Sequence, residues 1–169
     1  MHTSTTNRSI KWIENLAAQE VLIKGGERAS VDISHTKDEI LEIETATFVR
    51  ALYYHFQYLI RLFNFRVQQL GLEIKVARAS DSIEAFSLSR NGMRLNLCRP
   101  QNGTIQLTCD KVLDDDGTKT GNKTSMMFSG LIEAKFGAFH DVEWFFLGSR
   151  VTSEQVARHY LTEFIQVSR

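Results

Sequence analysis

An acidic run, Asp114-Asp115-Asp116-Gly117, is the first place in this sequence to look for a metal ion. Clustered carboxylates bind hard cations such as Ca²⁺, and a glycine lets the ligand loop turn tightly. The spacing does not fit a calcium loop, because aligning Gly117 with the sixth position puts Val112 at the first, where a carboxylate is needed, and Lys123 at the twelfth, where a glutamate is needed. We therefore interpret the run as a solvated loop, and we predict no metal ion and no cofactor.

Two cysteines flank a predicted hairpin, an arrangement that suggests a disulfide or half of a metal site. The register of that hairpin places Cys109 on the same face as Leu107 and turns Cys98, with Asn96, to the other side. A disulfide would then require the backbone to rearrange. We predict that Cys109 is a small core residue.

Acid–base chemistry has one candidate cluster, His140-Asp141 followed by Glu143, which lies at a predicted strand end. A turn between two strands explains the same residues. None of the five histidines forms a His-x-x-x-His pair or lies beside a Cys-x-x-Cys motif, so a zinc site is not predicted. Nucleophile-elbow and phosphate-loop patterns are missing from the sequence as well, and we predict no catalytic residue.

The elements that must position these residues begin with a helix predicted over residues 36–70. Thr36 and Glu39 form a capping box at its start, and Gly71 is a natural C-cap. Its apolar residues lie on two faces, whereas an ordinary surface helix buries one stripe. The first stripe consists of Val49, Leu52, Tyr53, Phe56, Leu59, Ile60, Phe63 and Val67, and the second of Phe48, Ala51, Tyr58, Leu62 and Phe65.

Two different elements could pack against the second stripe and bury it. One is a second chain or another protein partner, and the other is a short N-terminal helix, predicted from Ser9, whose Trp12 and Leu16 would pack on the stripe. Several large apolar side chains exposed in one patch are unusual for a monomer. We predict self-association or partner binding through Phe48, Tyr58, Leu62 and Phe65. His55 lies on this side of the helix, either buried with a hydrogen-bond partner or forming a pH-sensitive contact.

Turn signals set the register of an antiparallel meander after the long helix. Asn91-Gly92 predicts a two-residue hairpin. Gln101-Asn102-Gly103 predicts a three-residue loop with Gly103 in the left-handed conformation. Both turns place Leu95 and Leu97 on the core face, and a slip of one residue at either turn would reverse that. The predicted pairs are Phe86–Leu97, Leu88–Leu95, Leu97–Leu107, Leu95–Cys109 and Arg99–Ile105.

The remaining segments complete an α+β prediction for a single domain over residues 1–169. We expect a disordered tail over 1–8, strands over 73–79, 128–138 and 142–148, and a flexible loop over 110–125, with a helix over 126–136 as the alternative to a strand. A capping box at Thr152 opens a C-terminal helix. The predicted fold is an antiparallel meander sheet of about five to six strands, packed on the long central helix and the C-terminal helix, with a short N-terminal helix.

Composition limits the classes of function. The 20 basic and 20 acidic side chains cancel, so no overall charge draws the protein to nucleic acid or to an anionic membrane. No apolar run is long enough for a membrane span, and no signal peptide pattern is present. Two cysteines without a disulfide framework fit a reducing cytoplasm, which is the predicted location.

Three functional hypotheses follow, and the first is a non-enzymatic interaction or regulatory module that self-associates through the long helix. The second is a small-ligand-binding or enzymatic domain with a pocket between sheet and helix, lined by Tyr54, Arg61, Glu133, His140 and Glu143. The third is nucleic-acid binding through a local basic patch, although the outer sheet face lacks aromatic residues for base stacking. The residues of that patch are Arg50, Arg61, Lys75 and Arg94.

Overall fold

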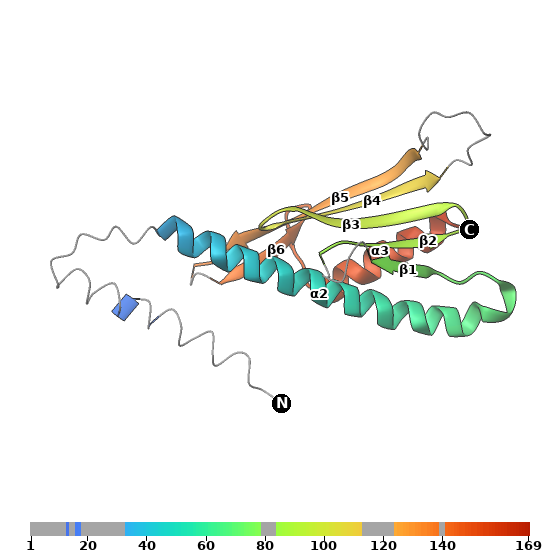
Figure 1. The fold of residues 1–169 in the computed structure, drawn as a ribbon, viewed down its shortest axis with the longest axis horizontal. Helices are drawn as coiled ribbons and strands as arrows, with labels where there is room; N and C mark the ends of the chain where they lie inside the picture. The colour runs from blue at the N-terminus through green and yellow to red at the C-terminus, as the bar shows by residue number, and fades with distance from the viewer. Residues whose placement is uncertain (1–12, 14–15, 18–32, 79–83, 113–123, 139–140) are drawn as a thin grey trace. The chain divides into compact units, whose positions relative to one another are not determined.

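A computed structural model of the protein describes residues 13, 16–17, 33–78, 84–112, 124–138 and 141–169 (Figure 1). The chain divides into two units, 1–37 and 38–169, and the second contains the whole sheet, helix α3 and helix α2 from Asp38 onward. Ile13, Leu16 and Ala17 are helical, while the rest of the predicted N-terminal helix and the tail over 1–8 lie outside the described residues.

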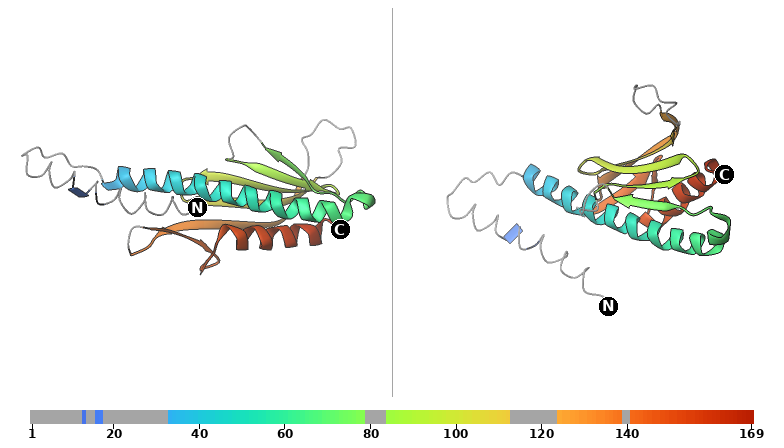
Figure 2. Two further views of the ribbon diagram at one scale, coloured as in Figure 1. Left: turned by 90° about the horizontal axis from the view of Figure 1, so that it is seen from below. Right: turned by 45° about the vertical axis from the view of Figure 1, so that its right-hand side comes forward.

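The sheet is a seven-stranded antiparallel meander whose strands follow their order in the sequence. One face of it is covered by the two helices, as the sequence predicts (Figure 2). The elements are α2 (Ile33–Val67), the 3₁₀ turn η1 (Gln68–Leu70), β1 (Lys75–Arg78), β2 (Phe86–Arg90), β3 (Met93–Gln101), β4 (Thr104–Val112), β5 (Thr124–Phe136), β6 (Val142–Phe146), β7 (Ser149–Arg150) and α3 (Ser153–Val167).

The first hairpin has the predicted register. Asn91 and Gly92 have φ angles of 49° and 73°, the left-handed pair that a two-residue turn between twisted strands requires. Phe86 therefore pairs with Leu97, and Leu88 pairs with Leu95. Because these side chains point to the same face, the turn chemistry directs four buried residues into the core.

The second hairpin differs from the prediction at its tip. Leu97–Leu107 and Leu95–Cys109 pair as predicted, and Gly103 has a φ of 76°. The predicted Arg99–Ile105 pair is replaced by a β-bulge between Cys98 and Gln101, and Gln101 pairs with Thr104 across a two-residue turn. Pro100 lies in the bulge, where its missing amide N–H costs no ladder hydrogen bond.

Helix α2 begins earlier than predicted. Residues 33–36 are already helical, so Thr36 is not an N-cap and the predicted capping box is wrong. The Glu39 amide lies beyond the first four N–H groups, which are the ones that need a capping acceptor. At the other end α2 tightens into η1, and Gly71 follows with the left-handed φ of 65° predicted for the cap.

The predicted loop over 110–125 and the strands after it need correction. Asp110 to Val112 belong to β4, and β5 begins at Thr124 with Val112 as its partner, so strand pairing shortens the loop at both ends. The acidic run lies outside the described residues. The segment over 126–136 is a strand and not a helix.

A seventh strand is the main addition to the predicted sheet. Leu147 and Gly148 form a two-residue turn with φ angles of 49° and 79°, and β7 folds back so that Phe146 pairs with Ser149. Leucine is not a residue that favours positive φ, which explains why the sequence predicted one continuous strand to Gly148.

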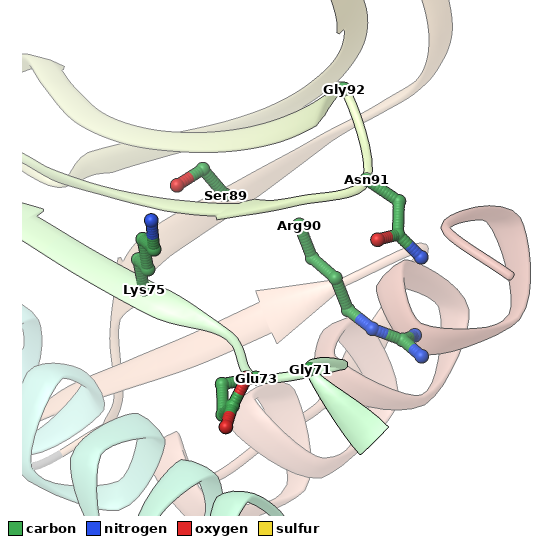
Figure 3. A pocket seen from close by; sticks show the side chains of 7 residues that line it. All are labelled: Gly71, Glu73, Lys75, Ser89, Arg90, Asn91 and Gly92. Atoms are coloured by element: carbon green, nitrogen blue, oxygen red, sulfur yellow. The ribbon is translucent and has the colours of Figure 1, made fainter. Parts of the chain in front are cut away.

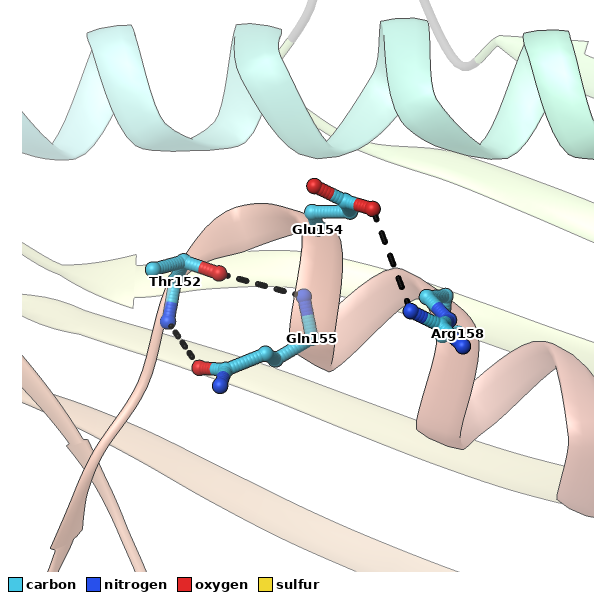
Figure 4. Close-up of polar contacts among 4 residues, drawn as sticks. All are labelled: Thr152, Glu154, Gln155 and Arg158. Carbon is cyan, nitrogen blue, oxygen red and sulfur yellow. Dashed lines mark hydrogen bonds and ion pairs between the residues drawn. The ribbon is translucent and has the colours of Figure 1, made fainter.

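Helix α3 starts at the predicted capping box (Figure 4). The Gln155 amide donates to Thr152 Oγ1 at 3.2 Å, and the Thr152 amide donates to Gln155 Oε1 at 2.9 Å. These two bonds satisfy N–H groups that helix geometry leaves unpaired. They fix the end of α3 that follows β7, and the helix then packs Val156, Ala157, Tyr160, Leu161 and Phe164 into the core.

Two acidic groups in the core make the folded state sensitive to alkali. Burial, with a smaller contribution from Asp110, raises the pKa of Cys109 from 9.0 to about 11. Burial also raises the pKa of Tyr160 from 10.0 to about 12, and among the described residues Tyr160 Oη has no hydrogen-bond partner. Cys98 is exposed on the other face, as the register predicts, and both cysteines are free.

Stability should therefore fall as the pH rises from about 9 to 12. In that range the unfolded chain releases the protons that folded Cys109 and Tyr160 retain, so alkali favours unfolding. Denaturant melts at pH 7, 9.5 and 11 measure this loss. Tyr160→Phe removes an unsatisfied hydroxyl, so we expect no loss of stability at pH 7 and a shallower decline above pH 10. An unfolding free energy that stays constant from pH 7 to 11 would contradict the prediction.

Candidate interaction surface

One face of α2 is fixed against the sheet by apolar packing. Val49, Leu52 and Phe56 are fully buried. Phe48 stacks on Trp144 of β6 with ring centroids 4.4 Å apart. Phe56 also meets Phe86 of β2 edge to face at 5.6 Å. The helix therefore crosses the sheet from β6 to β2, and its rotation about its own axis is set by these contacts.

Two polar contacts hold the same rotation. The Gly103 amide, in the turn between β3 and β4, donates to the buried Thr45 Oγ1 at 2.7 Å. Near the other end of α2, Asn64 Nδ2 donates to the Ile74 carbonyl at 2.9 Å, and the Ile74 amide donates to Asn64 Oδ1 at 2.8 Å. These two hydrogen bonds resemble the pairing between neighbouring strands, and they attach the residue before β1 to the helix.

The opposite face of α2 is exposed along three turns on either side of Tyr54. Five large side chains on it are at least half exposed, and we call them the outer stripe. They span about 33 Å at 1.5 Å per residue. The outer stripe consists of Ile43, Tyr54, Tyr58, Leu62 and Phe65.

The predicted interaction residues divide between the two faces. Tyr58, Leu62 and Phe65 belong to the outer stripe, and Phe65 is 68% exposed. Phe48 does not belong to it, because its ring is buried against Trp144. The sequence pattern could not separate Phe48 from the stripe, since its burial depends on how far β6 extends beneath the helix.

Sequence reasoning missed two members of the outer stripe. Ile43 was assigned to no stripe, and Tyr54 was assigned to the lining of a ligand pocket. Their signal was the spacing: Ile43, Tyr54 and Phe65 are separated by 11 residues each. Eleven residues make three turns with only about 20° of drift, so these three side chains share one line along the helix.

The residues predicted to line a ligand pocket do not converge. Tyr54 is exposed on α2, whereas Glu133 and Glu143 lie on the outer face of the sheet, where Glu143 pairs with Arg150 at 2.8 Å. His140 lies outside the described residues. The space between α2 and the sheet is filled by side chains that are at most 2% exposed, namely Leu52, Phe56, Leu88, Leu95 and Leu107.

One hollow, of about 380 Å³, lies where the turn between β2 and β3 meets the start of β1 (Figure 3). The Arg90 side chain extends from it toward the end of α3 and is buried. It donates to the Leu72 carbonyl at 3.0 Å, the Ile165 carbonyl at 3.3 Å and Ser168 Oγ at 3.0 Å. Because these acceptors belong to the turn before β1 and to the end of α3, Arg90 joins both segments to β2, and its N–H groups are engaged within the chain. The hollow's lining residues are Gly71, Glu73, Lys75, Ser89, Arg90, Asn91 and Gly92.

A second, shallower hollow of about 300 Å³ lies beside α2 and contains Arg61. Its polar residue Asn64 is occupied by the two hydrogen bonds to Ile74. Apolar Ile60 and Val76 form the rest of its wall, together with Gln57. Gln57 is engaged as well, because its Nε2 donates to Tyr53 Oη at 2.6 Å.

The basic residues proposed for nucleic acid do not form one patch. Arg50 and Arg61 are exposed on α2, which covers the inner face of the sheet. Lys75 pairs with Ser89, which pairs with Arg94, and these residues alternate with the buried ones, so they point to the outer face. The two pairs therefore lie on opposite sides of the helix and sheet layers. Arg94 in addition lies beside Asp110 on β4.

The described ranges contain neither a metal-ligand cluster nor a membrane-spanning helix. No cluster of three or more histidine, cysteine or acidic side chains there could hold a metal ion. Within those ranges, no helix combines the length and apolar character needed to cross a membrane.

Comparison with known proteins returned no match, whether to models of protein families, to curated protein sequences or to solved structures. Among the described residues, the outer stripe gathers five large exposed apolar side chains along one helix, whereas β5 exposes Met126, Met127 and Leu131.

Proposed function

We propose that this protein is a non-enzymatic interaction or regulatory module that self-associates through the outer stripe of α2. The observation that carries this proposal is the exposure of Tyr54, Tyr58, Leu62 and Phe65 on a helix whose other face is already buried. Large exposed apolar patches on a folded protein mark interaction sites.

The composition of the outer stripe supports an interface. Tyrosine and arginine are enriched among the residues that dominate binding energies, and Tyr54 and Tyr58 lie between Arg50 and Arg61 on this face. A tyrosine covers a large contact area and loses little side-chain entropy when it becomes ordered. The contacts that fix the rotation of α2 also hold the stripe in place before any partner arrives, which lowers the entropic cost of association.

Substituting Leu62 with glutamate tests the proposal. Leu62→Glu places a charge within the stripe, and we expect the dissociation constant of the dimer to rise about a hundredfold or more. Static light scattering over a dilution series measures the mass directly, and circular dichroism checks that the fold is retained.

Leu131→Glu is the matched control. Leu131 is 46% exposed on the outer face of β5, against 50% for Leu62, so both variants add the same charge at a similar exposure. We expect Leu131→Glu to leave the mass unchanged. A wild-type monomer at tens of micromolar, or a dimer that only Leu131→Glu disrupts, would refute the proposed surface.

A further inference from the structure

We propose that two copies pair their α2 helices antiparallel, about a two-fold axis that passes beside Tyr54. This inference rests on the proposed self-association and adds the orientation and register of the partner. In such a pair each residue of one helix faces the residue of its copy at the same distance on the other side of Tyr54.

The spacing of the outer stripe is symmetric about Tyr54. Ile43 lies 11 residues before it and Phe65 lies 11 residues after it. An antiparallel pair with this centre places Ile43 of one chain against Phe65 of its copy at both ends of the contact. The exposed apolar side chains at the two ends of the stripe are then buried together.

The arginines of α2 favour the same orientation. Arg50 lies four residues before Tyr54 and Tyr58 lies four residues after it, so the antiparallel pair brings Arg50 to the Tyr58 ring of the copy. Arg61 faces Thr47 of the copy in the same way. A parallel pair would instead place Arg50 against Arg50 and Arg61 against Arg61, at the centre of an interface where like charges repel.

The charge along the helix is also divided between its ends. Between residues 38 and 44 the helix carries its four carboxylates, and from residue 45 to residue 67 its charged side chains are three arginines. An antiparallel pair places the acidic start of each helix along the basic end of the other, and it also opposes the two helix dipoles. The carboxylates are Asp38, Glu39, Glu42 and Glu44, which Lys37 precedes, and the arginines are Arg50, Arg61 and Arg66.

Spin labels at two positions outside the outer stripe test the orientation. Glu42 and Arg66 are both exposed and each lies 12 residues from Tyr54. Labels are attached to Glu42→Cys or to Arg66→Cys in a Cys98→Ser background, where the remaining Cys109 is buried. Double electron–electron resonance then measures the distance between the two copies of one label.

The expected distance is roughly 35–45 Å for both positions, from 24 residues of helix rise and the separation of two packed helices. Equal distances at the two positions place the axis at Tyr54. Distances below about 30 Å at both positions would show a parallel pair, and clearly unequal distances would show another register; either result overturns the inference.

The mass of each labelled protein, measured by light scattering, separates this inference from the proposed function. A labelled dimer with short distances contradicts the antiparallel pairing and leaves self-association standing. A monomer contradicts both. The labelled Leu62→Glu variant is the control, in which we expect no dipolar signal between copies.

Discussion

Leu95→Asp should abolish folding. Leu95 lies on the inner face between Leu88 and Cys109 of the neighbouring strands and is 2% exposed. The substitution removes a buried side chain, at a cost of about 2–5 kcal/mol, and leaves a carboxylate in the core without a partner. Since domains are stable by only about 5–15 kcal/mol, the sum exceeds what the fold can lose.

Ser89→Asp is the matched control for this prediction. Ser89 lies in the adjoining strand, but its side chain points to the outer face between Lys75 and Arg94, so a carboxylate there meets water and two basic neighbours. We expect Ser89→Asp to melt like the wild type, while Leu95→Asp gives no cooperative transition by circular dichroism. A soluble Leu95→Asp variant with a sharp melt would contradict the assigned register.

Gly130→Ala should disrupt the packing of α3 on β5. A Cβ at Gly130 would overlap the Tyr160 hydroxyl and would lie 2.8 Å from Tyr160 Cζ and 3.2 Å from Phe146 Cε2. Because the Tyr160 side chain is buried between α3 and the sheet, removing this overlap requires α3 to move away from β5. We expect a loss of about 3 kcal/mol. The corresponding fall in Tm is roughly 6–12 °C.

A double-mutant cycle identifies the cause of that loss. In a Tyr160→Ala background the overlapping atoms are gone, so Gly130→Ala should cost less than it does in the wild type. Ser129→Ala, one residue away and exposed, should change the unfolding free energy by less than about 0.5 kcal/mol. An equal cost of Gly130→Ala in both backgrounds would show that the overlap is not responsible.

The strand register could be predicted wherever the residues of a turn specify its backbone conformation. Asn91-Gly92 specifies a left-handed pair of residues, and the strands it joins have no freedom to slip without exposing Leu88 and Leu95. The turn at Leu147-Gly148 has the same geometry, but leucine carries no signal for it. The start of α2 was predicted wrongly as well. The capping pattern at Thr36 indicates a helix start, but the helix begins at Ile33 and Thr36 lies inside it.

The buried Arg90 marks a different limit of sequence reasoning. The alternation of β2 assigns it to the inner face with Phe86 and Leu88, yet its charge argues for the surface. Only the folded chain shows the carbonyl groups of Leu72 and Ile165 that accept its N–H groups. Those acceptors come from segments distant in sequence, so no local pattern could indicate them.

The sequence predicted a second apolar face on α2, but it did not predict every residue that the structure exposes there. Excess apolar residues on α2 follow from the sequence alone, and Tyr58, Leu62 and Phe65 are exposed on it. Which residues border the stripe depends on tertiary contacts: Trp144 buries Phe48, while the rotation fixed by Thr45 and Asn64 leaves Ile43 and Tyr54 exposed.

The molar mass of the wild-type protein in dilute solution tests the central claim most directly. One chain has a mass of 19.3 kDa. Self-association through the outer stripe predicts about twice that mass by sedimentation equilibrium at tens of micromolar, with a fall toward the monomer on dilution. A mass that stays at 19.3 kDa throughout that range would contradict it.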